Sequence, residues 1–203
     1  MKKFLAILLS AVLCLTVGMA IGCNKASDDY EVTAEEFVSA ITFEGQTNYK
    51  ITTTNTVVSA EGSEVMTMVV ERAGDKIKLT MTDSETEIGY VEKVGDKYYN
   101  YSEDGEGFVK VEGNKQIFDT YASVNLASLG IEYADLTYNA ETKAYEAATI
   151  ESEQGEMSEV SFKFEDNKLV SCSMKLAYGP EATATQTVAV VYGDVTVTLP
   201  TVE

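Results

Sequence analysis

The chain of 203 residues contains no histidine and no tryptophan. Histidine is the usual general base near neutral pH and the commonest nitrogen ligand of zinc, so His-dependent triads and most zinc hydrolase designs are excluded. Neither an S-x-x-K arrangement nor a G-x-S-x-G elbow is present to replace them. A pair of carboxylates acting as catalytic acid and base remains formally possible. We therefore expect no enzyme, with no catalytic residue, no metal site and no cofactor.

Basic residues are also scarce. The chain has 15 lysines and arginines against 33 aspartates and glutamates, a formal net charge of −18. This field repels phosphate backbones, and no basic cluster offsets it, so we expect no nucleic acid partner. The acidic stretches at residues 83–87, 102–107 and 151–156 lack the D-x-[DN]-x-[DN]-G pattern of a calcium loop and read as solvated hairpin tips.

Long apolar runs are absent except at the N-terminus. Lys2 and Lys3 precede an uncharged stretch from Phe4 to Ile21, which is the pattern of a secretory signal. Loss of this segment would remove both lysines and leave a formal net charge of −20. Nothing after Cys23 resembles another membrane span. We interpret the polar residues that follow Cys23 as a tether between the membrane and the folded domain.

The tetrad Ala20-Ile21-Gly22-Cys23 resembles a bacterial lipobox. The resemblance implies that acyl chains such as palmitate are attached at Cys23, which becomes the N-terminal residue. Two alternatives stay open: ordinary secretion after cleavage at Gly18-Met19-Ala20, and an uncut apolar anchor. We expect a signal peptide at residues 1–22, a lipidated cysteine and polar tether at 23–32, and one domain at 33–203. The expected location is the extracytoplasmic face of the cell membrane.

The chain has three cysteines, and two of them belong to the N-terminal segment. Cys172 is therefore the one cysteine of the domain, and no intramolecular disulfide is expected. Because Cys172 alternates with Met174 and Leu176, we expect a buried core thiol rather than a reactive one.

Residues 33–36, Thr-Ala-Glu-Glu, form a capping box that predicts a short helix ending near Thr42. From Gln46 onward apolar residues recur at every second position, which is the pattern of β-strands. Turns are predicted at residues 73–76, 95–97 and 166–168. The recurrent Gly-Asp-Lys and Asp-Asn-Lys triplets at these turns reflect turn chemistry rather than a functional repeat. The pattern predicts roughly ten antiparallel strands, the last through Val195, Val197 and Leu199.

One helix is expected to interrupt this meander. Asn114 can cap it, Ile117 and Tyr121 share its apolar face, and Gly130 is placed to end it. The expected length is about 15 residues. Two helices are too few to cover a sheet of this size, which must curl into a half-barrel, close into a barrel or fold into a sandwich.

The order of lipidated cysteine, tether, capped helix, meander, central helix and further meander resembles the lipoprotein-carrier fold of LolA- and LolB-type proteins and LppX/LprG-type lipoproteins. That resemblance implies a mainly β (α+β) fold, in which a long curved antiparallel sheet forms an incomplete barrel wrapped around two helices. It also implies that acyl chains are held between sheet and helices.

Flexible methionines and aromatic rings on one concave face would suit an acyl chain of variable shape. The candidate ligand-binding residues are Met66, Met68, Leu79, Met81, Tyr99, Tyr101, Phe118, Tyr121, Phe162, Phe164 and Met174. The other interpretation is that these side chains fill a dry core.

The leading hypothesis is a membrane-anchored extracytoplasmic lipoprotein that binds a lipid or other hydrophobic ligand without covalent chemistry. The alternative is an envelope lipoprotein that docks a protein partner, not identified by the sequence, and carries no small molecule. A contiguous apolar cavity larger than about 300 Å³ would favour the ligand, and its absence would favour docking.

Overall fold

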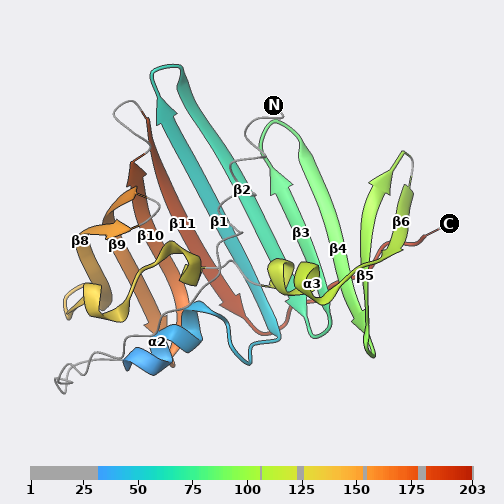
Figure 1. Cartoon of the computed structure of the whole chain (residues 1–203), viewed down its shortest axis with the longest axis horizontal. Helices are drawn as coiled ribbons and strands as arrows, with labels where there is room; N and C mark the ends of the chain where they lie inside the picture. Colours follow the sequence, from blue (N-terminus) through green and yellow to red (C-terminus); the bar gives the residue numbers. More distant parts are fainter. Residues whose placement is uncertain (1–31, 106, 123–125, 153–154, 178–181, 203) are drawn as a thin grey trace.

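The computed structural model describes residues 32–105, 107–122, 126–152, 155–177 and 182–202. Eleven strands form one antiparallel sheet in the order β6-β5-β4-β3-β2-β1-β11-β10-β9-β8-β7 (Figure 1). The sheet is open, with β6 and β7 as its edges, so the predicted fold class is confirmed. The strands are β1 (Asn48–Ser59), β2 (Gly62–Ala73), β3 (Lys76–Thr82), β4 (Thr86–Val94), β5 (Lys97–Asp104), β6 (Gly107–Glu112), β7 (Thr137–Asn139), β8 (Ala144–Ser152), β9 (Gly155–Glu165), β10 (Lys168–Ala177) and β11 (Ala182–Tyr192).

The predicted turns join these strands. Gly74 and Gly95 lie at φ +63° and +62°, where a side chain would be strained, and each follows directly on a strand. Asp166 and Asn167 also have positive φ, as two-residue hairpin turns require. Two meanders result, β1–β6 and β7–β11, and the long pairing of β1 with β11 joins them into one sheet.

Helix α2 (Ala34–Ile41) begins with the predicted capping box. The Thr33 hydroxyl accepts a bond from the Glu36 amide, and the Glu36 carboxylate accepts one from the Thr33 amide at 2.7 Å. This backbone bond from Thr33 holds the pKa of Glu36 below its ordinary value. The Asn167 side-chain amide donates to the same carboxylate at 2.6 Å, which ties the start of α2 to the β9–β10 turn.

Helix α3 (Lys115–Ala122) also starts as predicted, because the Asn114 side chain accepts a bond from the Ile117 amide at 3.0 Å. The helix was predicted to run to Gly130, but the described α-helical residues are Lys115–Ala122, and Leu126–Leu129 forms a 3-10 turn, η1, instead of continuing the α-helix. The Tyr49 hydroxyl also donates to the Ala122 carbonyl, so the sheet satisfies an acceptor at the end of the helix.

A second 3-10 turn, η2 (Tyr133–Asp135), precedes β7. Among the described residues, neither helix has the length and apolarity that a membrane crossing requires.

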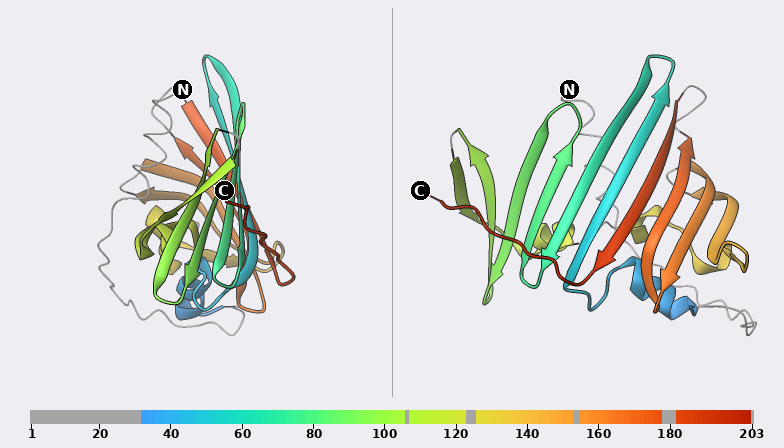
Figure 2. Two further views of the ribbon diagram at one scale, coloured as in Figure 1. Left: turned by 90° about the vertical axis from the view of Figure 1, so that its right-hand side faces the viewer. Right: turned by 180° about the vertical axis from the view of Figure 1, so that it is seen from behind.

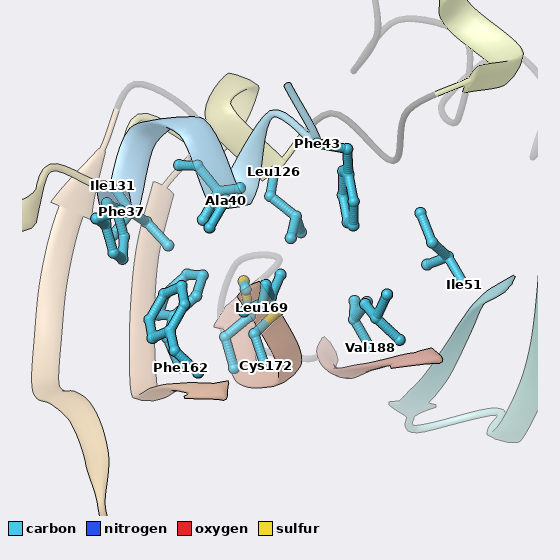
Figure 3. Packing of buried hydrophobic residues seen from close by; sticks show 14 of the residues in the cluster. Phe37, Ala40, Phe43, Ile51, Leu126, Ile131, Phe162, Leu169, Cys172 and Val188 are labelled. Carbon is cyan, nitrogen blue, oxygen red and sulfur yellow. The ribbon is translucent and has the colours of Figure 1, made fainter. Parts of the chain in front are cut away.

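Both helices lie on one face of the sheet, here called the inner face (Figures 1 and 2). Alternate side chains of β8–β11 point toward α2 and η1. Figure 3 shows Phe162 opposite Phe37, and Leu169 and Cys172 opposite Leu126. The Phe37 ring meets Phe162 edge-on at a centroid distance of 5.4 Å. This half of the inner face is a packed aromatic core.

Val32, the first described residue, packs with the domain. Residues 1–31, with the signal peptide, Cys23 and most of the tether, lie outside the described residues. Val32 was predicted to belong to the tether, but it is 1% exposed. Its amide donates to the Tyr145 hydroxyl at 2.9 Å, and its carbonyl accepts bonds from the hydroxyls of Tyr145 and Tyr133. Val32 is thus part of the core.

The predicted last strand through Val195, Val197 and Leu199 is not formed. Both edges of β11 are already paired, with β1 and β10, and positive φ at Gly193 and Asp194 turns the chain away. Residues 193–202 instead cross the face opposite the helices, here called the outer face, and run toward β6 (Figure 2). Val197 is buried there, and Val202 makes an isolated bridge to Phe108.

Candidate functional site

The strand register brings four of the predicted ligand-binding residues together on the inner face. Met68 of β2 lies opposite Met81 of β3, and Leu79 lies opposite Val70, which is buried. Met66 precedes Met68 by two positions, so it shares this face. All four predicted side chains are only half-buried. They form a group, here called the methionine patch: Met66, Met68, Leu79 and Met81.

Helix α3 packs beside the methionine patch. Gly89 of β4 lies opposite Leu79, and a methyl group added at Gly89 would meet the Tyr121 ring at 3.6 Å. Tyr121 is half-buried, and burial raises the pKa of its hydroxyl. Phe118 is buried against Tyr98 at a centroid distance of 5.6 Å. Tyr121 thus borders the patch, whereas Phe118 fixes the helix to the sheet.

Three other predicted residues lie in the packed half of the inner face. Phe162, Phe164 and Met174 are 0%, 4% and 1% exposed. Phe162 and Phe164 both contact the Phe37 ring of α2. These side chains share a face with the methionine patch but fill the core. For these three residues the structure therefore agrees with the second interpretation of the sequence, a dry core.

The structure does not bring Tyr99 and Tyr101 to the inner face. Tyr101 is paired with Tyr90 and Tyr99 with Glu92, and these positions alternate with Val91, which faces the helices. Both tyrosines therefore point to the outer face. The prediction placed them on the wrong side of the sheet.

On the outer face Tyr101 takes part in a small polar cluster. Its hydroxyl donates to the Glu92 carboxylate at 2.6 Å, and the Lys110 ammonium also contacts this carboxylate. Lys110 lies over the Tyr99 ring at 4.1 Å from its centroid. Burial raises the pKa of Glu92, but the bonds from Lys110 and Tyr101 outweigh this effect and leave it below its ordinary value. This is a structural ion pair rather than a ligand site.

Three polar residues in the centre of the inner face were not predicted. Thr53 and Asn55 follow Tyr49 and Ile51 at two-residue spacing on β1, and Gln186 of β11 lies opposite Asn55. The sequence contained this signal, because extending the Tyr49–Ile51 alternation by two steps places both residues on the buried face. The uninterrupted polar run at residues 52–56 concealed it.

Thr53 is 1% exposed, and its hydroxyl has no hydrogen-bond partner in the described part of the chain. Asn55 and Gln186 are half-buried, and the side-chain hydrogen bonds found among the described residues do not involve either amide. Buried polar groups are normally paired, so an orphaned hydroxyl in a mainly apolar face requires an explanation.

Charged groups lie at the margins of this region. Glu64 is paired with Val57 and Glu87 with Met81, so both carboxylates belong to the inner face, and both are exposed. Arg72 lies on the same face beyond Val70. Its Nε donates to the Gly74 carbonyl at 3.1 Å, and its guanidinium lies over the rings of Tyr49 and Phe118.

Two surface hollows lie elsewhere. One, of about 410 Å³, is lined mainly by serine and threonine side chains of the outer face, Thr52 and Thr187 among them. The other, of about 720 Å³, lies near Val32 and the β9–β10 turn. The methionine patch lines neither of these hollows. The candidate site is the half-buried surface of this patch, on the inner face beside α3.

No protein-family model and no curated protein matches the chain. Among solved structures, a domain described as an outer membrane lipoprotein-sorting protein domain from Vibrio parahaemolyticus is similar. The TM-score is 0.26 and the identity 8%, over 78% of this chain and 91% of that one. The fold class stated above rests on the strand order and register of this chain itself.

Proposed function

We propose that the protein is a membrane-anchored extracytoplasmic lipoprotein that binds a hydrophobic ligand non-covalently on its inner face. The observation that carries the proposal is the methionine patch. Its apolar side chains stay half-buried while the neighbouring half of the same face is packed under α2. An apolar surface beside a short helix suits a ligand that completes the burial.

The composition of the patch favours an acyl chain. Methionine side chains are flexible and polarizable, and they adapt to apolar ligands of different shape. Burial of apolar surface contributes about 25 cal/mol per Å², so an acyl chain along β2 and β3 would supply the affinity without any charged contact. Tyr121 of α3 lies at the edge of the patch and would close over such a chain.

Native mass spectrometry of the Cys23→Ser chain, purified without detergent, tests ligand binding. We expect co-purifying lipid that is lost in Met66→Glu, because a charge on the inner face opposes burial of an acyl chain. Val65→Glu is the matched control, since Val65 is 54% exposed on the other face of the same strand. A lipid-free protein that also ignores added acyl probes would contradict the proposal.

The anchor is tested separately. We expect the unaltered chain to incorporate labelled palmitate and to sediment with membranes, and Cys23→Ser to lose the label. Label in the Cys23→Ser variant, or no label in either protein, would count against acylation at this position.

A second candidate function is docking of a protein partner. Val109 and Val111 of edge strand β6 are 39% and 55% exposed, and an edge strand with apolar side chains can accept another strand. A lipid-free protein whose binding to an envelope partner is lost on Val111→Lys would favour this function over ligand binding.

A further inference from the structure

We infer that the ligand of the inner face carries an uncharged hydrogen-bonding group, such as a hydroxyl, ester or amide, which is bound by Thr53, Asn55 and Gln186. This inference rests on the proposed function and names the class of ligand: an uncharged amphiphile with an apolar chain. The three residues are here called the polar anchor.

The polar anchor adjoins the methionine patch. Thr53 is register-paired with Met68 on one side and Val188 on the other, and Asn55 is paired with Met66 and Gln186. Neighbouring strands lie about 4.8 Å apart, so each anchor residue is within one or two strand spacings of a patch methionine. A polar group bound at the anchor would therefore direct its apolar chain onto β2 and β3.

The orphaned hydroxyl of Thr53 is the observation that points to a ligand. It is removed from water and has no partner among the described residues, although valine would fill the same space. A hydroxyl and two primary amides can each donate and accept. Together they can satisfy an alcohol, ester or amide on the ligand.

The surrounding charges disfavour a carboxylate. No anchor residue is charged, and Glu64 and Glu87 face the same side of the sheet. The nearby cation, Arg72, is held by the Gly74 carbonyl and by two aromatic rings. The carboxylates of Glu64 and Glu87 would repel a fatty acid anion, and the polar anchor offers no positive charge to bind it. A neutral head group needs no positive charge and is not repelled.

Photo-crosslinking tests the inference on the full chain, purified in the form that the cell produces. Three probes with the same mid-chain diazirine are compared: a long-chain alcohol, the corresponding carboxylate and the corresponding hydrocarbon. Crosslinked peptides are quantified by mass spectrometry in the wild type, Thr53→Val and Gln186→Leu. Thr52→Val is the matched control, because it changes the next residue of the same strand on the outer face.

We expect the alcohol to label peptides of β2 and β3 more strongly than the carboxylate or the hydrocarbon. This labelling should fall about fivefold in Thr53→Val and in Gln186→Leu, the effect of one lost hydrogen bond, and stay unchanged in Thr52→Val. Equal labelling by all three probes, or an unchanged Thr53→Val, would overturn the polar anchor and leave the proposed function standing. Failure of every probe to label β2 or β3 would overturn both.

Discussion

At the residue scale, Thr53 has opposite effects on stability and on binding. A buried hydroxyl without a partner lowers the stability of the ligand-free protein, and valine has nearly the same shape. Thr53→Val should therefore raise the free energy of unfolding by about 1 kcal/mol, measured by urea titration with circular dichroism in lipid-free protein.

The comparison with Thr52→Val gives this prediction its control, because Thr52 is half-buried on the outer face, where water can reach its hydroxyl. That variant should change the free energy of unfolding by less than about 0.5 kcal/mol. A destabilised Thr53→Val protein would show that the hydroxyl has a partner, and it would remove the reason to look for one on a ligand.

The buried thiol of Cys172 should make the stability of the protein depend on pH. Burial raises the pKa of its thiol from 9.0 to about 12, so the folded state keeps the proton at a pH where the unfolded chain loses it. Its contribution to stability is fully present below pH 9.0 and is lost as pH rises toward 12. Stability should decline across this range, and less steeply in Cys172→Ala.

Labelling with iodoacetamide checks the same residue directly. The thiol is 3% exposed, and we expect it to react in urea but not in the native protein at pH 8. Rapid labelling of Cys172 in the native protein, located by peptide mass spectrometry, would contradict the buried position that both sequence and structure give it.

Single residues also mark the limit of what the sequence could predict. The run Tyr98-Tyr99-Asn100-Tyr101 carries aromatic rings on both faces of β5, so its alternation does not say which face is inner. Only the strand register resolves this. Asn100 is paired with Val91 of the core, so Tyr98, two positions away, shares the inner face, whereas Tyr99, paired with Glu92, lies on the other side. By contrast, Thr67 separates Met66 from Met68, and Met81 lies between two threonines, so the face of these methionines was predictable.

At the element scale, α3 is attached to the sheet by few side chains. Phe118 is its large buried anchor, beside Tyr98 and Arg72. Phe118→Ala should lower the free energy of unfolding by about 3 kcal/mol and increase amide exchange in α3 before the strands open. Gln116→Ala, exposed on the same helix, is the control and should change neither.

If exchange in α3 and in β1 rose together after Phe118→Ala, the helix would be an integral part of the sheet's cooperative unit. That outcome would contradict the idea that α3 can open over a ligand while the sheet remains folded.

Elements were predictable where local chemistry determines them. The capping box of α2 and the Gly-Asp-Lys turns act within a few residues, and both were predicted correctly. The path of residues 193–202 depends on distant contacts, because both edges of β11 are occupied by β1 and β10. No local pattern contains that information.

At the scale of the whole molecule, the two halves of the inner face differ. The β8–β11 half is filled by aromatic rings under α2, whereas the β2–β3 half presents methionines beside α3. The open sheet follows from composition, since two short helices leave part of a face uncovered. Which half is filled could not be read from the sequence, because both halves show the same alternation.

The most direct test of ligand binding is methyl NMR of the protein labelled at methionine, titrated with a long-chain alcohol. The account predicts that the methyl signals of Met66, Met68 and Met81 shift, while that of Met157, 1% exposed in the core, stays in place. If no methyl signal of the patch responds, or if Met157 responds instead, the inner face does not bind the ligand as proposed.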